Sequence, residues 1–431
     1  MTTPSARSRL DAALAAIGDP AGEGARACLT VYRDAAIAAA DAADARARQG
    51  ISLGPLDGAI VTIKDLFDVA GEVTRAGSKV LAEEGKVAEA DAPVVRRLRA
   101  AGAVIVAKTN MTEFAFSGVG ANPHYGTPAN PADRSRVPGG STSGGAVAVA
   151  DGMCEIAIGS DTGGSTRIPA ALCGIVGYKP SRQRIPTEGA FPLSQTHDSI
   201  GPMAMTVADC ARADAVLAGE APWALAPAPL AGLRVGVAQG LPLDALDDTV
   251  AKRFPQALAA LEKAGARLAP EALPLLDAMN AVHARGGIVP AEGYAVHRAR
   301  IARAKDRIDP MIATRIERAG NIASADYIAM RNERAALVAA MDERLADIDV
   351  LALPTTAIAA PTIAEMLDPQ TFGRKNAMLL RNTTIGNFFD LCAISLPIPG
   401  DGLPCGLMLM ARNGHDRRLF RIAAAVEKIL A

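Results

Sequence analysis

Two clusters of glycine and serine, separated by one short apolar run, constrain this chain more than any other feature. The first is residues 139–145 (G-G-S-T-S-G-G) and the second is residues 159–169 (G-S-D-T-G-G-S-T-R-I-P). Between them, Ile156-Ala157-Ile158 has the length and character of a buried strand. Glycine lets the backbone approach a ligand closely, and successive backbone N–H groups in such a turn can converge on one oxygen. The residues alone favour a serine-based active site, with a linker or a phosphate-binding loop as alternatives.

Neighbouring residues argue against both alternatives. Apolar residues continue through 146–150 and 156–158, which is not the composition of a flexible linker. Neither cluster contains the lysine of a G-x-x-x-x-G-K-[ST] phosphate loop.

The two clusters together resemble the signature of the amidase signature family of serine hydrolases. That pattern is roughly G-G-S-S-G-G-S, a strand, and then G-x-D-x-G-G-S-[apolar]-R-x-P. Thr142 and Thr166 depart from it, at positions whose side chains do not react. Residues 54–65 (G-P-L-D-G-A-I-V-T-I-K-D) and 108–114 (K-T-N-M-T-E-F) match further stretches of the family. The resemblance is strong over residues 50–220, good over 350–431, and only in outline between them.

The resemblance implies a set of roles for the site residues. Ser165 would be the nucleophile, Ser141 would pass on its proton, and Lys64 would be the base. In the family, the serine corresponding to Ser141 follows a cis peptide bond. The oxyanion of the tetrahedral intermediate would be held by backbone N–H groups of Thr162, Gly163, Gly164 and Ser165. We expect Asp161 and Arg167 to pair and brace the nucleophile loop, and we expect no metal or cofactor.

Lys64 follows the apolar run 59–63, which predicts a buried strand. From spacing alone, a lysine at a strand end usually reaches water. Only the resemblance makes it the base, and desolvation beside an apolar strand would lower its pKa so that it can be neutral. Asn110 either lines the site or caps a helix that begins after it, and we predict the cap. We expect no direct role for His124.

Strand and helix patterns alternate along the chain. Strands are predicted at 59–63, 103–107, 156–158, 233–237 and 349–356, and a short helix followed by a strand at 170–179. Helices are predicted at 35–48, 92–102, 206–218, 249–264, 324–345 and 422–430. This alternation predicts a mostly parallel or mixed sheet with helices on both faces. The resemblance implies an α/β amidase-signature fold, in which a central mixed, largely parallel, twisted sheet is covered by helices on both faces. Residues 1–220 would form the catalytic core, 221–348 a helical substrate-shaping segment, and 349–431 the rest of the core.

Composition excludes several classes of protein. The formal net charge of -1 over 431 residues lacks the basic excess of a nucleic-acid binder. We find no secretory signal and no membrane span, and the six scattered cysteines favour buried reduced thiols in a cytoplasmic protein. We expect a monomer or homodimer.

The expected substrate is a small amide, carbamate or ester with an apolar or aryl acyl group, because aromatic residues make up only 3% of the chain and Met and Ile recur in the middle segment. Arginines of residues 279–318 are expected to be solvated. An α/β-hydrolase would show G-x-S-x-G and a serine β-lactamase S-x-x-K, and neither motif fits. Alternatives that stay open are a subunit of an amidotransferase complex and a non-catalytic assembly subunit.

Overall fold

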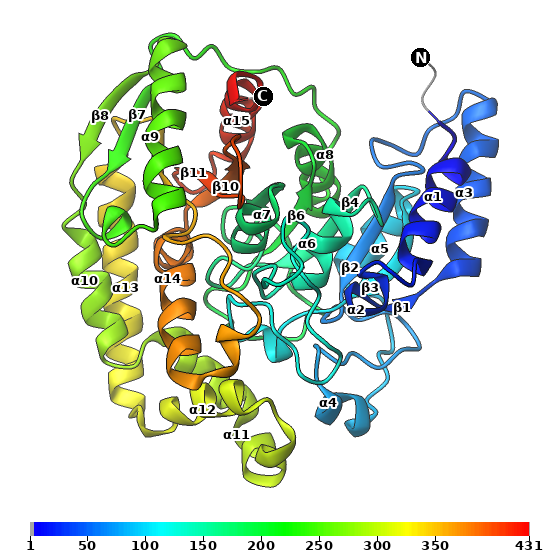
Figure 1. Ribbon diagram of the computed structural model, residues 1–431, viewed down its shortest axis with the longest axis horizontal. Helices are drawn as coiled ribbons and strands as arrows, with labels where there is room; N and C mark the ends of the chain where they lie inside the picture. The colour runs from blue at the N-terminus through cyan, green and yellow to red at the C-terminus, as the bar shows by residue number, and fades with distance from the viewer. Residues whose placement is uncertain (1–3, 431) are drawn as a thin grey trace.

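One 11-stranded sheet runs through the computed structural model, which describes residues 4–430 (Figure 1). Its strands are β1 (Cys28–Val31), β2 (Ile60–Lys64), β3 (Val104–Thr109), β4 (Ile156–Ser160), β5 (Val176–Lys179), β6 (Ile200–Ala204), β7 (Arg234–Ala238), β8 (Arg267–Glu271), β9 (Val350–Pro354), β10 (Cys392–Pro397) and β11 (Gly406–Ala411). Across the sheet they lie in the order β1-β3-β2-β4-β6-β5-β10-β11-β9-β7-β8. The sheet is mixed, as predicted.

Parallel pairs lie in two groups toward the ends of this sheet. Strands β3, β2 and β4 form one group, and β9, β7 and β8 form the other. The strands between them pair antiparallel, and Ala393 of β10 lies opposite Lys179 of β5. Residues from the beginning, middle and end of the chain therefore share one sheet, because β7 and β8 come from the segment 221–348.

Helices cover both faces because the strands are apolar on both sides. Along β9, Val350 and Ala352 join one buried cluster, whereas Leu351 and Leu353 join another. One face is covered by α5 (Pro93–Ala100), α8 (Val207–Ala218), α9 (Asp248–Lys263) and α15 (Asp416–Leu430). The other is covered near β2–β4 by α1 (Ala6–Gly18), α3 (Arg33–Arg48), α6 (Ser143–Ala150) and α7 (Arg167–Cys173).

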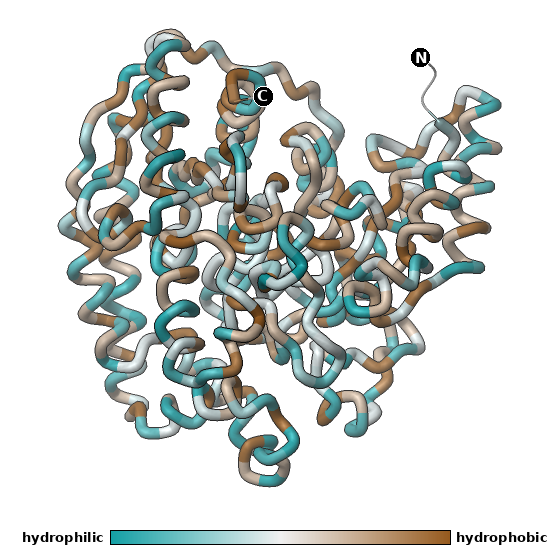
Figure 2. Tube along the Cα trace, in the orientation of Figure 1, coloured by the Kyte–Doolittle hydropathy of each residue, from teal (hydrophilic) through white to brown (hydrophobic). Residues whose placement is uncertain are grey.

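The outer helices carry one apolar side each. Figure 2 shows them changing between teal and brown along their length, as expected when one side packs inward. The middle segment adds α10 (Leu275–Ala284), α11 (Ile288–Ala304), α12 (Pro310–Arg318) and α13 (Ser324–Arg344), which lie with α14 (Pro369–Phe388) on the left and lower side of Figure 1. Short helices α2 (Gly24–Ala27) and α4 (Lys79–Glu84) complete the set of α-helices described over residues 4–430.

The predicted strands and helices are present, with shifted ends. Thr206 caps α8 as predicted, because its side chain accepts a hydrogen bond from the N–H of Asp209. The closing helix begins at Asp416, six residues before the predicted start at residue 422. Strands β1, β6, β8, β10 and β11 were not predicted. Within residues 4–430, all six cysteines are unpaired and buried. Over the same residues, no helix has the length and apolar character that a membrane span requires.

Candidate active site

The site forms where two parallel strands end side by side. Strands β2 and β4 are neighbours, with Ile63 opposite Ile158, and their carboxyl ends lie at the same edge of the sheet. Lys64 is the last residue of β2, and Ser160 is the last residue of β4. The loop 161–166 follows β4 directly and leads into α7. The fold thus brings the predicted lysine to the base of the second glycine-serine cluster, at the strand edge where α/β sheets commonly bind ligands.

Lys64 is fully buried and contacts two hydroxyl groups. Its Nζ lies 2.7 Å from Ser141 Oγ and 2.9 Å from Ser160 Oγ. Burial lowers the pKa of Lys64 to about 7, against the opposing pull of the carboxylates of Asp161 and Asp198. A substantial fraction of this amine is therefore neutral near pH 7 and can accept a proton from a hydroxyl.

Ser141 belongs to a tightly packed turn before α6. The peptide bond between Gly140 and Ser141 is cis, and the carbonyl oxygen of Ser141 accepts a hydrogen bond from the N–H of Thr112 at 3.1 Å. A Cβ atom on Gly140 would lie 2.6 Å from the backbone nitrogen of Gly120, so only glycine fits at position 140. The side chain of Ser141 is fully buried and directed at Lys64.

Ser165 lies beside this turn and borders a cavity of about 530 Å³. Its carbonyl oxygen accepts a hydrogen bond from the N–H of Thr142 at 3.3 Å, which joins the two glycine-serine clusters. Among residues 4–430, no protein hydrogen bond involves the Ser165 hydroxyl, although the residue is only 4% exposed. The structure therefore brings Lys64 and Ser141 into direct contact, and it leaves the Ser165 hydroxyl free at the cavity.

Several backbone N–H groups of the same loop also lack protein acceptors among the described residues. Over the described residues, the N–H groups of Thr162, Gly163 and Ser165 have no protein acceptor, and all three residues line the cavity. Gly164 differs from the prediction, because its N–H donates to Asp161 Oδ1 at 2.9 Å. Three of the four predicted donors are thus available to a ligand oxygen.

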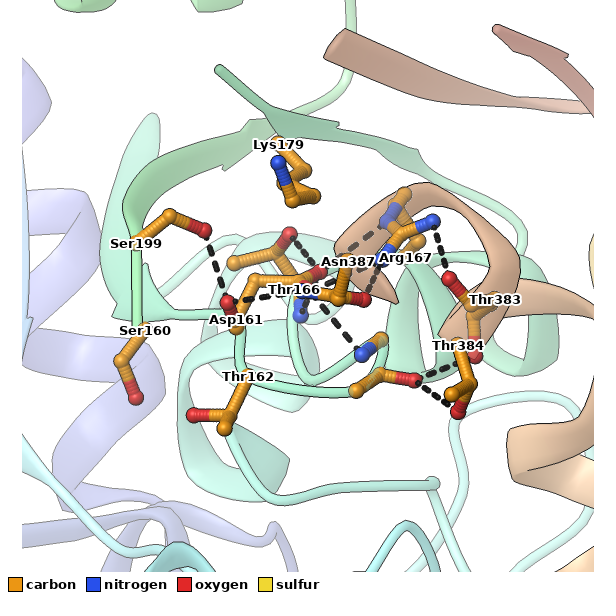
Figure 3. A network of polar contacts seen from close by, with 12 residues as sticks. Ser160, Asp161, Thr162, Thr166, Arg167, Lys179, Ser199, Thr383, Thr384 and Asn387 are labelled. Atoms are coloured by element: carbon orange, nitrogen blue, oxygen red, sulfur yellow. Dashed lines mark hydrogen bonds and ion pairs between the residues drawn. The ribbon is translucent and has the colours of Figure 1, made fainter. Parts of the chain in front are cut away.

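Asp161 connects several parts of the loop 161–166 through hydrogen bonds (Figure 3). Besides Gly164, it accepts hydrogen bonds from the N–H and hydroxyl of Thr166, at 3.2 and 2.9 Å. Arg167 approaches it with two nitrogens, Nη2 at 2.8 Å and Nε at 3.1 Å, and both side chains are fully buried. Burial by itself would raise the pKa of Asp161, but the Arg167 guanidinium and Asn387 hold it well below its usual range. The carboxylate is therefore ionised and positions the loop.

Residues of α14 complete this network, and sequence reasoning did not single them out. Arg167 Nη1 donates to the carbonyl oxygen of Thr383 at 3.0 Å, and Arg167 Nη2 to Asn387 Oδ1 at 2.7 Å. The Thr383 hydroxyl donates to the carbonyl oxygen of Gly163 at 2.6 Å. Figure 3 shows these side chains approaching the loop from the opposite side to Ser199. Ser160 was also missed, although it is the residue directly before Asp161 in the second cluster.

The structure contradicts the prediction for Asn110, and the expectation that His124 has no direct role stays a prediction. Asn110 does not cap a helix. Its side chain donates to the carbonyl oxygens of Arg26 and Gly126, at 2.9 and 2.8 Å, and so joins helix α2 to a loop that is distant from it in sequence. His124 contacts the buried carboxylate of Glu113 at 3.0 Å and does not border the cavity.

The cavity above Ser165 draws its walls from three parts of the chain. The first part, which precedes the middle segment, contributes residues 115–117, Thr162, Gly163, Ser165, Leu193 and His197. The middle segment contributes Leu241, several residues between 279 and 290, and Arg315, and one face of α14 forms the third part. Most of the wall is apolar, with Leu193, Met279 and Ile288 among its members. Arg315 is not solvated as expected: it borders this cavity, with its guanidinium 5.1 Å from the centre of the Phe116 ring.

Comparisons with known proteins agree with this geometry. A family model described as Amidase matches residues 18–420. The chain is 36% identical to 2-amino-5-chloromuconic acid deaminase of Comamonas testosteroni, over 91% of this chain and 86% of that protein. It is 34% identical to a subunit of the glutamyl-tRNA(Gln) amidotransferase of Koribacter versatilis, over 94% and 91% of the two chains. A crystal structure of an amidase superposes with a TM-score of 0.88 at 31% identity, covering 99% of this chain and 97% of that one. The chain therefore belongs to the amidase family and is a hydrolase of C–N bonds.

Proposed function

We propose that this protein hydrolyses a small amide through an acyl-enzyme formed on Ser165, with Ser141 and Lys64 as the proton relay. The observation that carries the proposal is the 2.7 Å contact between Lys64 Nζ and Ser141 Oγ, made by a buried lysine beside the loop of Ser165. A serine hydroxyl becomes a useful nucleophile when an adjacent group takes its proton. In the proposed relay Ser141 takes the proton of Ser165 and gives its own proton to Lys64, whose lowered pKa lets it accept one.

The proposed reaction proceeds in two halves. Ser165 Oγ attacks the amide carbonyl carbon while its proton passes to Ser141, whose own proton passes to Lys64. The oxyanion takes hydrogen bonds from the N–H groups of Thr162, Gly163 and Ser165, where losing one donor typically costs about 10²-fold in rate. The relay returns the proton to the leaving nitrogen, the C–N bond breaks, and the amine departs. Water then attacks the ester by the same relay and releases the acid.

We further propose that residues 221–348 shape the substrate pocket. Support comes from the cavity wall, to which this segment contributes Leu241, Met279, Ile288 and Arg315. A largely apolar wall suits an apolar or aryl acyl chain. Carbamates and esters have a carbonyl of the same geometry, so we expect activated members of both classes to react as well.

The experiment is a comparison of purified wild-type protein with Ser165→Ala, Lys64→Ala and Thr206→Ser. Substrates are p-nitroanilides, p-nitrophenyl esters and aryl carbamates of matched acyl groups. We expect Ser165→Ala to abolish turnover of all three, Lys64→Ala to lower kcat by about 10²- to 10⁴-fold, and the remote cap variant Thr206→Ser to react as wild type. Full activity of either site variant would refute the proposed roles.

A second candidate is favoured by the similarity to glutamyl-tRNA(Gln) amidotransferase subunits. Those proteins are named as subunits, so this chain would then act with partner chains. The two candidates differ in one measurable property, which is activity of the purified chain alone. Turnover of simple amides without any partner supports the first, and glutamine hydrolysis that appears only with partner chains supports the second.

A further inference from the structure

The cavity above Ser165 contains two arginines and no acidic residue among its described walls. Arg315 comes from α12 and Arg381 from α14. Within residues 4–430, neither guanidinium makes an ion pair, whereas most arginines of α11 and its surroundings pair with glutamates at the surface. A largely apolar cavity with two cations that lack an ion-pair partner has a positive potential that favours an anionic ligand.

Arg315 is held so that one edge of its guanidinium remains unused. Its Nε donates to the carbonyl oxygen of Phe116 at 3.0 Å, and the guanidinium lies over the Phe116 ring. Among the described residues, its two Nη atoms have no protein acceptor. These atoms present parallel N–H donors with the spacing of the two oxygens of a carboxylate. Burial, together with the nearby positive charge of Arg318, lowers the pKa of Arg315 to about 10. The guanidinium is therefore charged at neutral pH, and among residues 4–430 no carboxylate pairs with it.

Arg381 and Asn376 stand on the same face of α14. The cavity-lining residues of this helix are spaced at three- and four-residue intervals, as one helix face requires: Gly373, Asn376, Ala377, Leu380, Arg381, Thr384 and Phe388. Asn376 Oδ1 accepts from the N–H of Gly118 at 2.9 Å, which leaves its Nδ2 as a donor without a protein acceptor among residues 4–430. Arg381 is anchored through Nε to Asn382 at 3.1 Å and through Nη2 to the carbonyl oxygen of Pro242.

We propose that the acyl group of the natural substrate ends in a carboxylate, which Arg315 and Arg381 bind in the cavity that Ser165 borders. The inference rests on the proposed function, since it names the class of amide that this site takes. The apolar wall then contacts the carbon chain between the two ends. The two Nη atoms of Arg315 bind the carboxylate and so set the preference for anionic over neutral acyl groups. Arg381 contributes a second positive charge.

The test uses two series of primary amides that differ only in charge. Succinamate, glutaramate and adipamate carry the carboxylate, and 4-methylpentanamide, 5-methylhexanamide and 6-methylheptanamide replace it by an isopropyl group of similar shape. Ammonia release gives kcat/KM for each pair in wild type, Arg315→Met, Arg381→Met and Arg318→Met. Arg318 is the matched control, because it lies on α12 but is exposed and outside the cavity.

We expect wild type to prefer the carboxylate of the best length by about tenfold or more, and Arg315→Met to reduce that preference by about 10- to 100-fold, equivalent to 1.4 kcal/mol per tenfold. Arg381→Met should reduce it less, and Arg318→Met should leave it unchanged. A second readout needs no turnover: succinate, glutarate or adipate should raise the Tm of Ser165→Ala protein, but not of the same protein with Arg315→Met.

Each remaining outcome is decisive. Hydrolysis of the neutral amides with equal or greater kcat/KM, or a preference that survives both cavity-arginine variants, would overturn the inference and leave the proposed function intact. If Arg315→Met does not fold, Arg381→Met and the dicarboxylate Tm shift carry the test. Absence of all amide hydrolysis, together with dicarboxylate binding that depends on Arg315, would reject the proposed function while supporting the anion site.

Discussion

Replacing Asp161 by asparagine tests whether its buried ion pair with Arg167 holds the loop that carries Ser165. The carboxylate accepts hydrogen bonds from Gly164, Thr166, Arg167 and Asn387, and each of these partners is a donor. An amide at this position keeps the shape but turns an NH₂ group toward some of those donors. It also leaves the fully buried guanidinium of Arg167 without a counter-charge.

The magnitude follows from that environment. Removing one partner of a buried ion pair costs about 3–5 kcal/mol. With an unfolding entropy of about 2.1 cal/mol/K per residue, a chain of 431 residues unfolds with about 0.9 kcal/mol/K, so the expected loss in Tm is about 3–6 °C at pH 7. The pKa of Asp161 is lowered in the folded protein, so its contribution is present above the unfolded value of about 3.9 and is lost as pH falls further. The difference between wild type and Asp161→Asn should therefore shrink in acid.

The assay is thermal unfolding of wild type, Asp161→Asn, Arg167→Met and the double variant, with Ser165-dependent amide hydrolysis measured in parallel. We expect the double variant to lose less than the sum of the single variants, because the two charges are coupled. Asp11→Asn, which breaks a solvent-exposed pair with Arg7, should leave Tm unchanged. A Tm within about 1 °C of wild type for Asp161→Asn, or strictly additive losses, would refute the reasoning.

Two further predictions concern the base and the mouth of the cavity. Because only neutral Lys64 accepts a proton, kcat/KM should rise with pH through an apparent pKa near 7. Ser160→Ala removes a hydrogen-bond acceptor of the charged amine, so it should move this rise in kcat/KM to lower pH. A flat profile between pH 6 and 8 (about one unit either side of 7) would contradict the role of Lys64 as the base. Gly373 lines the cavity, and a Cβ there would meet no atom within 4 Å, so Gly373→Leu should fold normally and lower kcat/KM for bulky acyl groups more than for acetamide. Gly18→Leu, which is exposed and remote, is the control, and equal losses for large and small substrates would count against this placement of the pocket.

Sequence patterns located the strands whose signal is local. The run before Lys64 and the run Ile156–Ile158 are continuous, β-prone and buried on both faces. Each can therefore be predicted as a strand from its own residues, without knowledge of the strands beside it. Strand β8 is different: it reads R-L-A-P-E and is mostly exposed at the edge of the sheet. Strand β6 begins I-G-P, and glycine and proline normally argue against a strand. Both strands form because a neighbouring strand supplies hydrogen bonds, which no local pattern records.

The parts of the site that sequence reasoning missed depend on contacts between distant residues. Arg315 contacts Phe116 across 199 positions, and the arginine-rich stretch around it gave no local reason to separate it from its solvated neighbours. Gly164 was predicted to bind the oxyanion because it belongs to the second glycine-serine cluster, which resembles the family signature. In the structure its N–H donates instead to the carboxylate of Asp161, three residues earlier. The resemblance to the family is what proposes the reacting residues, and packing decides which backbone donors remain free.

The hydrogen bonds of Arg167 also limit how early in synthesis the loop that carries Ser165 can reach its final structure. Its partners Thr383 and Asn387 lie 216 and 220 positions further along the chain. On the ribosome, the segment carrying Ser165 emerges long before these residues are synthesised, so the guanidinium has no complete set of acceptors until α14 has been made. A product that stops short of residue 383 would keep Lys64, Ser141 and Ser165 yet lack the contacts of α14 that support the loop 161–166, so we expect it to have no activity.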